Sequence, residues 1–219
     1  PLITKIDQST VAGISADKDS SRRRIAAGKL RLLGMRLLSA AGMSHDDAAM
    51  VSEHVVGNSL MGVDSHGVVR FSQYMSLIES GAIDPTGTPL VVNDDPAMTR
   101  IDGGGGHGVP AMVQLAECTA HKASTAGMAT GALVNCGHTG RIGAYAEMIA
   151  RQGCFAVIIG GGGHTRGNPK VAPYGGREGI MGTNPYTLAL PGGPTGVVVV
   201  DFATSTSAQG KLLAASKTG

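Results

Sequence analysis

The first third of the chain carries apolar residues three or four positions apart. This spacing predicts three helices, over residues 24–43, 44–62 and 65–80. Ser44 is followed by acidic residues, which is typical of a helix start because negative charge stabilises that end of the helix. Gly81 is expected to end the third helix.

Beyond residue 85, short apolar runs separated by glycine and proline replace the helical pattern. These runs predict strands over residues 90–92, 98–101, 131–134, 155–159, 187–190 and 197–200, with helices over 109–124 and 141–151. Strands that alternate with helices favour an α/β fold. We therefore expect a loose arm over residues 1–21, a helical region over 22–88 and an α/β domain over 89–219.

Composition and charge narrow the classes of function. Apolar residues make up 42% of the 219 positions, which excludes disorder caused by low hydrophobicity. The net charge of +2 gives no electrostatic reason to expect nucleic acid as a partner. No apolar run is long enough for a membrane span, and no signal peptide is expected. The three residues Cys118, Cys136 and Cys154 cannot pair completely, so we expect free thiols in a reducing compartment, the cytoplasm.

A cluster of glycines suggests, at first sight, a Rossmann dinucleotide-binding fold. Gly103, Gly105 and Gly108 satisfy the pattern G-x-G-x-x-G, and a predicted helix follows. A run this rich in glycine meets the pattern easily, however, and Asn135 stands where an acidic residue would bind the ribose. A Rossmann reductase is therefore kept only as an alternative.

The segment from Asp64 to Arg70 contains a candidate substrate site. If the predicted helix begins near Ser65, then His66 and Arg70 lie one turn apart and point the same way. A helix start beside an arginine suits a carboxylate, and a histidine there could exchange a proton with a substrate carbonyl or hydroxyl. The alternative is an ordinary capped helix with a solvated arginine.

A second candidate is the loop Gly137-His138-Thr139-Gly140, which follows a predicted strand and precedes a helix. Ligands of α/β proteins bind at the carboxyl ends of strands, and the flanking glycines would leave His138 accessible. The alternative is a turn that carries an ordinary surface histidine.

A third candidate follows the last predicted strand, where Asp201 is succeeded by a run of hydroxyl side chains. Together with backbone amides, the hydroxyls of Thr204, Ser205 and Thr206 could bind phosphate, although a serine/threonine turn is the commoner use of such a run. No metal is expected, because His138 and His164 lack partner ligands at short spacing.

Taken in order along the chain, five segments resemble the malate/L-lactate dehydrogenase family of the non-Rossmann type. This family includes ureidoglycolate dehydrogenase, sulfolactate dehydrogenase, diketogulonate reductase and piperideine-carboxylate reductase. The segments are Asp64-Ser65-His66-Gly67 with Arg70, residues 137–140, residues 171–176, residues 182–185, and residues 201–205 with Gly210-Lys211. The resemblance runs from about Arg24 to the end of the chain and leaves out residues 1–21.

The resemblance implies an oxidoreductase that uses NAD or NADP and acts on a small carboxylate substrate, either a 2-hydroxy or 2-oxo acid or a cyclic imino acid. It implies an α/β fold whose mixed sheet is flanked by helices, like that of sulfolactate dehydrogenase, with an N-terminal helical domain. The cofactor-binding part would lie within residues 89–219. The resemblance also implies a homodimer.

Matched position by position, the resemblance also implies roles for individual residues. His66 and His138 are alternative acid/base residues, and Arg70 would bind the substrate carboxylate. The other implied substrate contacts are Ser65 and Thr139. The implied cofactor contacts are His138, Thr183, Asn184, Pro185, Asp201, Thr204, Ser205 and Thr206.

Three features depart from the family pattern, and one of them is the N-terminal arm over residues 1–21. The stretch from Gly160 to Gly167, with His164 and Arg166, is longer than the usual loop before residues 171–176. We expect a flexible loop there, and an added anion contact is the alternative. The chain ends at Gly219, whereas family members continue, so we expect a fragment. A non-catalytic ligand-binding or oligomerising fragment is therefore the alternative from a different class of function.

Overall fold

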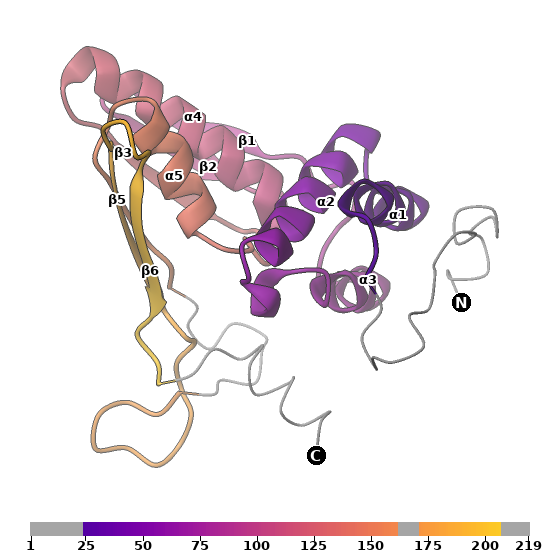
Figure 1. The fold of residues 1–219 in the computed structure, drawn as a ribbon. Helices are drawn as coiled ribbons and strands as arrows, with labels where there is room; N and C mark the ends of the chain where they lie inside the picture. Colours follow the sequence, from indigo (N-terminus) through magenta and orange to yellow (C-terminus); the bar gives the residue numbers. More distant parts are fainter. Residues whose placement is uncertain (1–23, 162–170, 207–219) are drawn as a thin grey trace. The chain divides into compact units, whose positions relative to one another are not determined.

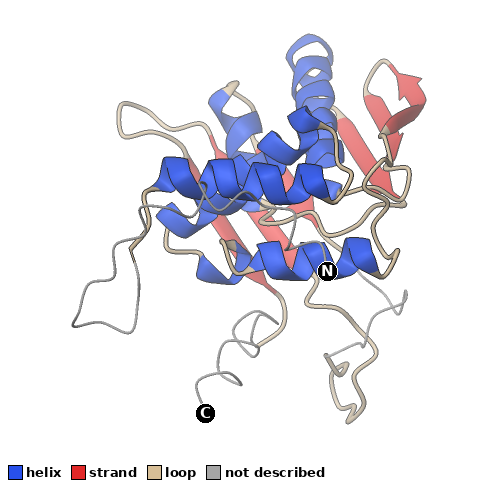
Figure 2. Cartoon of the chain, turned by 90° about the vertical axis from the view of Figure 1, so that its right-hand side faces the viewer, coloured by secondary structure: helices blue, strands red, loops and turns tan. Residues whose placement is uncertain are grey.

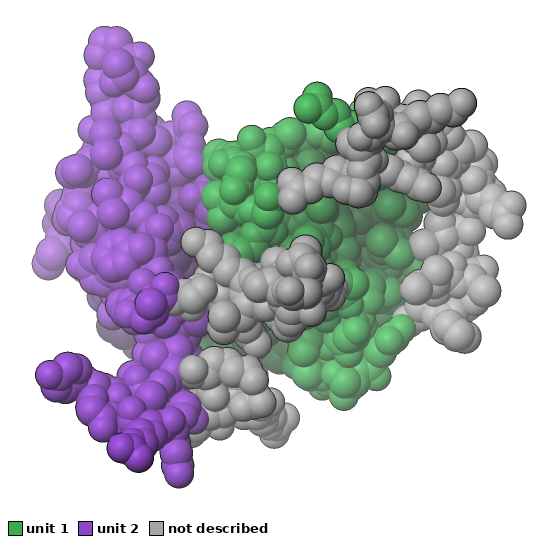
Figure 3. Space-filling model, turned by 60° about the horizontal axis from the view of Figure 1, so that its bottom comes forward, with its two compact units in different colours: residues 1–90, 102–111, 134–140 green, residues 91–101, 112–133, 141–219 purple. Residues whose placement is uncertain are grey.

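The computed structural model describes residues 24–161 and 171–206. The chain forms two compact units, which Figure 3 colours separately. Unit 1 comprises residues 1–90, 102–111 and 134–140, and unit 2 comprises residues 91–101, 112–133 and 141–219. The predicted arm over residues 1–21 lies outside the described residues. The predicted boundary near residue 88, between a helical region and an α/β domain, stays a prediction. Unit 1 is not one continuous stretch, because it also includes residues 102–111 and 134–140.

Helices and strands alternate along the chain, as Figures 1 and 2 show, and this confirms the predicted α/β pattern. The first elements are α1 (Ala27–Ala40), α2 (His45–Leu60), the 3₁₀ turn η3 (Asp64–His66) and α3 (Arg70–Glu79). They are followed by β1 (Leu90–Asp95), β2 (Met98–Asp102), α4 (Gly108–Ala126), β3 (Thr130–Val134), α5 (Gly143–Arg151), β4 (Ala156–Ile159), β5 (Pro185–Leu190) and β6 (Val198–Ala203). Within the described ranges, no helix combines the length and the hydropathy that crossing a membrane requires.

The core of unit 1 lies between α1, α2 and α3, which are grouped together in Figure 1. Leu38, Val55 and Tyr74 are fully buried in this core, one from each helix. Helix α2 begins where the sequence predicts, because the Ser44 hydroxyl accepts a hydrogen bond from the Asp47 amide at 3.1 Å. Apolar spacing and a capping side chain therefore suffice to define this part of the fold.

The prediction for the third helix is wrong at its start. Residues Asp64–His66 form a short 3₁₀ turn, Gly67 is extended, and α3 begins only at Arg70. Gly67 lies so close to Ser59 that an added Cβ would collide with the Ser59 hydroxyl. The backbone breaks at this contact, so His66 and Arg70 belong to different elements and do not share a helical face.

Glycines in the loop after β2 allow separate parts of the backbone to come into direct contact. The Gly105 amide donates to the Asn135 carbonyl at 2.8 Å, and the Gly137 amide donates to the Gly106 carbonyl at 2.7 Å. Gly104 and Gly105 have φ angles of 62° and 70°, in the left-handed region that favours glycine. The loop before α4 and the loop after β3 are therefore held together through their main chains.

This use of the glycines explains why the Rossmann interpretation is wrong. A Cβ on Gly108 would lie 2.6 Å from the Gly137 carbonyl oxygen, so the glycine makes room for another loop of the chain and not for a pyrophosphate. Asn135, at the position of the acidic residue, has a φ of 51° and donates from Nδ2 to Asp102 at 2.7 Å. The pattern G-x-G-x-x-G arises here from loop packing.

In unit 2, β4, β5 and β6 form an antiparallel sheet in that order. Thr187 on β5 stands opposite Ile158 on one neighbour and Asp201 on the other, so the three side chains share one face. Small residues of α5 pack on this sheet, where Ala146 and Ala150 meet alanines of the strands. Strand β6 extends to Ala203, beyond the predicted end at residue 200, and Asp201 therefore lies within the strand.

Two glycines of α1 offer a matched test of the unit 1 core. A Cβ on Gly34 would collide with the Phe71 ring and the Ser52 hydroxyl, whereas a Cβ on Gly28 would meet nothing within 4 Å. We expect Gly34→Ala to lower the free energy of unfolding by about 1–3 kcal/mol, the usual cost of overpacking. Gly28→Ala should raise it by about 0.5–1 kcal/mol, because alanine favours a helix more than glycine does.

Urea unfolding of both variants measures these changes as shifts of the midpoint at constant slope. Equal shifts in the same direction would contradict the packing of Gly34 against α2 and α3.

Candidate active site

Four histidines of unit 1 form a cluster, in which the other three lie close enough to His138 to act on its charge, and two of the four contact Tyr74 of α3. They come from four different segments: His54 from α2, His66 from η3, His107 from the loop before α4, and His138 from the loop after β3. The rings of His66 and His138 are stacked, with centroids 5.7 Å apart and planes inclined at 19°. The ring of His107 lies edge-on to Tyr74 at 4.3 Å. The two histidines that the sequence singled out are thus brought together.

Arg70 is the cation of this cluster, and only 5% of it is exposed. Its Nε donates to the Ser65 carbonyl at 2.6 Å, and its Nη1 donates to the side-chain oxygen of Gln73. Burial lowers the pKa of Arg70 below its ordinary value, but a guanidinium stays protonated in proteins. The structure therefore holds a fixed positive charge beside the histidines, with Ser65 in direct contact.

His138 is fixed by two groups that meet the same ring nitrogen. Its Nδ1 lies 2.9 Å from the Tyr74 hydroxyl and 3.1 Å from the Gly140 amide nitrogen. The pKa of His138 lies well below the ordinary value, first because the ring is withdrawn from water and then because Arg70 and the other three histidines oppose a further positive charge. His138 is therefore neutral at physiological pH.

Gly140 is required in this loop for two reasons. Its φ of 72° lies in the left-handed region, where residues with a Cβ are strained. A Cβ would also collide with the imidazole of His54. Only glycine can carry the amide that meets His138 at this point. Thr139 lies between the two residues, and its methyl group is close to Gly108.

His66 has a different partner from that of His138. Its Nδ1 lies 3.1 Å from the hydroxyl of Ser65, a group that can either donate or accept. Its backbone carbonyl accepts from the side chain of Asn58 at 3.2 Å, which fixes η3 against α2. Both His66 and His138 are partly buried.

Three members of the cluster were missed in the sequence: His54, Tyr74 and His107. Tyr74 is one turn beyond Arg70 on the same helix, but a buried tyrosine at that spacing is indistinguishable from a core residue. His107 stands inside the glycine run, and it is 4% exposed. Its Nδ1 accepts from the Val109 amide at 3.2 Å, while its Nε2 has no hydrogen-bond partner among the described residues.

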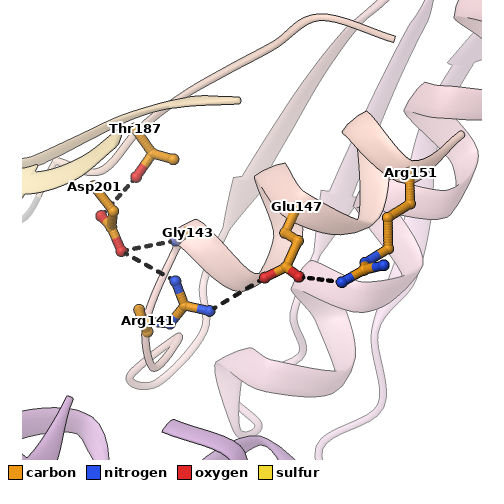
Figure 4. Close-up of polar contacts among 6 residues, drawn as sticks. All are labelled: Arg141, Gly143, Glu147, Arg151, Thr187 and Asp201. Carbon is orange, nitrogen blue, oxygen red and sulfur yellow. Dashed lines mark hydrogen bonds and ion pairs between the residues drawn. The ribbon is translucent and has the colours of Figure 1, made fainter. Parts of the chain in front are cut away.

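A second group of predicted residues lies in unit 2, around Asp201 (Figure 4). The carboxylate accepts from the Thr187 hydroxyl at 2.6 Å and from the Gly143 amide at 3.1 Å, and it lies 3.8 Å from Nη1 of Arg141. Arg141 also pairs with Glu147 at 3.7 Å. These contacts connect β5 and β6 to the start of α5. Asp201 therefore has a structural role, independent of any ligand.

The remaining predicted cofactor contacts meet where β5 begins and β6 ends. The Thr204 hydroxyl donates to the Asn184 carbonyl at 2.8 Å, and its amide donates to the Thr183 carbonyl at 3.2 Å. Asn184 has a φ of 42°, an uncommon conformation for a residue with a side chain. Pro185 opens β5, and Ser205 and Thr206 follow β6. The structure therefore places residues 183–185 and 204–206 at one end of the sheet.

The predicted loop over residues 160–167 lies largely outside the described residues, and His164 with it. Among the residues that the structure describes, no group of three or more His, Cys, Asp or Glu side chains is arranged to hold a metal ion. Cys118, Cys136 and Cys154 are free thiols.

Comparison with known proteins places this fold in the class of α/β hydroxy-acid dehydrogenases outside the Rossmann type. The family model for malate/L-lactate dehydrogenase matches residues 25–219, and the chain belongs to that family. The family resemblance and the non-Rossmann fold expected from the sequence are thus confirmed.

Among its relatives, the chain is 34% identical to L-sulfolactate dehydrogenase of Methanocaldococcus jannaschii, over 82% of the chain and 50% of that protein. It is 33% identical to malate dehydrogenase of Pyrococcus abyssi, over 89% of the chain and 52% of that protein. The chain spans about half the length of the curated relatives that it matches.

Solved structures agree with these relatives. Malate dehydrogenase from Pyrococcus horikoshii superimposes with a TM-score of 0.81 and 32% identity, covering 90% of this chain and 55% of that one. Sulfolactate dehydrogenase from Methanocaldococcus jannaschii gives a TM-score of 0.79 and 31% identity, covering 89% and 55%.

The buried histidines predict a pH dependence of stability. Burial, and then the neighbouring His54, lower the pKa of His107 to about 3. In the unfolded chain the pKa returns to about 6.5, so between these values the unfolded state binds more protons. The free energy of unfolding should therefore fall as the pH drops from 6.5 towards 3, with His107 contributing roughly 1 kcal/mol per pH unit.

Urea unfolding between pH 4 and pH 7 measures this slope. His107→Gln should reduce it, whereas His45→Gln should not, because the His45 side chain is 73% exposed. An unchanged slope in His107→Gln would contradict a neutral, buried His107.

The Asp201 network predicts an unequal response to two similar substitutions. Asp201→Asn removes the charge opposite Arg141 and weakens the acceptor of the buried Thr187 hydroxyl, so the free energy of unfolding should fall by about 1–3 kcal/mol. Asp94→Asn removes an exposed partner of Lys122 and should cost less than about 1 kcal/mol. Thermal unfolding of both variants compares them, and equal losses would refute the structural task of Asp201.

Proposed function

We propose that the chain carries the substrate-binding and proton-transfer residues of a dehydrogenase that uses NAD or NADP and acts on a small 2-hydroxy or 2-oxo acid. The observation that carries the proposal is the cluster of His66, His138 and Arg70, in which a buried cation and two partly buried imidazoles come together in unit 1. Membership of the malate/L-lactate dehydrogenase family supports the class of reaction.

Arg70 is proposed to bind the carboxylate of the substrate. A guanidinium has five N–H donors, so its bonds to Ser65 and Gln73 orient the group without exhausting it. Burial strengthens its attraction for an anion, because the surrounding dielectric is low. Ser65 and Thr139, which flank the two histidines in sequence, are proposed as further substrate contacts.

One of the two histidines is proposed to handle the proton of the reacting oxygen. Oxidation of a 2-hydroxy acid releases a proton from the hydroxyl, and reduction of a 2-oxo acid requires one at the carbonyl oxygen. A positioned imidazole serves both directions. Arg70 would fix the orientation of the substrate relative to that imidazole.

The residues at the end of the unit 2 sheet fit the polar parts of a dinucleotide. When bound, the nicotinamide would accept or supply the hydride. The uncommon backbone of Asn184 and the hydroxyl-rich turn at residues 204–206 present neutral donors and acceptors, which suit ribose and phosphate groups. We propose that Thr183, Asn184, Pro185 and residues 204–206 hold the cofactor there, with Asp201 supporting them and His138 among the implied contacts.

The family resemblance leads us to include a homodimer in the proposal. The free thiols favour a reducing compartment such as the cytoplasm, and the balanced charge favours a small carboxylate over nucleic acid as a partner.

Turnover measurements test the proposal. The 219-residue chain is supplied with NADH or NADPH and a panel of 2-oxo acids, and loss of reduced nicotinamide is followed by absorbance. We expect at least one of His66→Ala and His138→Ala to lower kcat/KM about 10²–10⁴-fold, the usual range for loss of a catalytic acid or base. Arg70→Lys should act mainly on KM. His121→Ala, an exposed histidine of α4, is the matched control.

The outcomes separate the alternatives. Cofactor binding without turnover would favour the non-catalytic fragment. This alternative stays open because the chain spans only about half the length of the relatives that it matches. Neither binding nor turnover would refute the enzyme proposal for this chain.

A further inference from the structure

The hydrogen bonds around His138 fix which of its ring nitrogens carries the proton. Nδ1 faces the Gly140 amide at 3.1 Å and the Tyr74 hydroxyl at 2.9 Å. An amide N–H can only donate, so it requires a lone pair at Nδ1 and is repelled by a proton there. A neutral imidazole has one N–H, which must then be on Nε2.

The Tyr74 hydroxyl reinforces this arrangement. Tyr74 is fully buried, and burial raises the pKa of its hydroxyl, so the group keeps its proton and can donate. The amide direction cannot change, because the left-handed backbone of Gly140 and its contact with His54 determine it. Because the Gly140 amide faces a lone pair on Nδ1, that nitrogen carries no proton for the Tyr74 hydroxyl to accept. The hydroxyl therefore donates to Nδ1.

We infer that Tyr74 is a positioning residue which, together with the Gly140 amide, places the ring proton of His138 on Nε2 and holds the ring as a neutral hydrogen-bond donor. The inference rests on the proposed function for its consequence in catalysis. Its structural content, the position of one proton, does not depend on any substrate or cofactor.

This arrangement divides the work between the two histidines. A histidine that acts as acid and base at Nε2 carries a proton on Nδ1 both before and after it releases the Nε2 proton. The Gly140 amide disfavours a proton on Nδ1, so it disfavours both of these forms of His138. His138 would therefore polarise the substrate oxygen through a hydrogen bond from Nε2, as a neutral imidazole can. His66 would exchange the proton, because its Nδ1 partner is the Ser65 hydroxyl, which can accept as well as donate.

The chemical balance of the step is simple. In the reduction of a 2-oxo acid, the carbonyl carbon would receive the hydride that a bound reduced nicotinamide supplies, and the carbonyl oxygen would receive a proton from protonated His66, which would become neutral. His138 gives up no proton and keeps its hydrogen bond to that oxygen. The charged and titratable groups that face His138 are Arg70, His54, His66, His107 and the Tyr74 hydroxyl, and the first four oppose a positive charge on it.

Nitrogen NMR of the histidine rings tests the position of the proton directly. The free 219-residue chain, with its seven histidines labelled with ¹⁵N, is studied from pH 5 to pH 9, and loss of signals in His138→Gln assigns the ring. We expect an unprotonated Nδ1 and a protonated Nε2 over the whole range. A proton on Nδ1, or titration of His138 near its ordinary pKa of about 6.5, would overturn the inference.

Substitution of the tyrosine tests its role. In Tyr74→Phe we expect the ratio of the Nε2–H to the Nδ1–H form of His138 to fall about fivefold, which corresponds to the loss of one ordinary hydrogen bond. Tyr145→Phe removes a hydroxyl from an equally buried tyrosine in unit 2 and should leave the His138 signals unchanged. A folded Tyr74→Phe chain with unchanged signals would remove Tyr74 from the inference. If that variant does not fold, the wild-type spectrum still decides the position of the proton.

The division of roles is tested separately, by pH profiles of kcat. Glutamine keeps an N–H donor but does not titrate, so His138→Gln should lower kcat and retain the pH-dependent limb. His66→Gln should remove that limb. The opposite pattern would overturn the division, whereas absence of all turnover in the wild-type chain would bear on the proposed function and leave the NMR result intact.

Discussion

The candidate site depends on direct backbone contact between the loop after β2 and the loop after β3. Glycines permit this contact, and the amides of Gly105 and Gly137 secure it with hydrogen bonds of 2.8 and 2.7 Å. One loop carries His107 and the other carries His138, so the contact delivers both imidazoles to the helical core beside Tyr74. A side chain on any of the closest glycines would separate the loops and, with them, the histidines.

Around this contact the protein concentrates groups that would repel one another if all were charged. Arg70 is buried and permanently cationic, and four imidazoles lie near it. The structure resolves the conflict by keeping His107 and His138 neutral, through burial and through donors directed at their Nδ1 atoms. Arg70 keeps its positive charge, which suits an anionic ligand.

Sequence patterns predicted those parts of the fold that depend on local spacing. Helix α2 and the α/β alternation follow from apolar periodicity. The break at Gly67 could not be predicted, because it results from a contact with Ser59, eight positions earlier in another element. Tyr74 and His54 were missed for a related reason: helical spacing marks a side chain as buried but does not show which polar group it meets.

The constraints on Gly140 also bear on how this position can change in evolution. Its backbone is left-handed, its Cα lies against His54, and its amide faces His138. Every amino acid that a single nucleotide change can put in place of glycine carries a Cβ. Each such change would strain the backbone and displace the amide at once, so no gradual route of replacement is open. Residue 140 is therefore expected to tolerate no other amino acid, because one replacement would disturb its own backbone, His54 and the contact with His138 together.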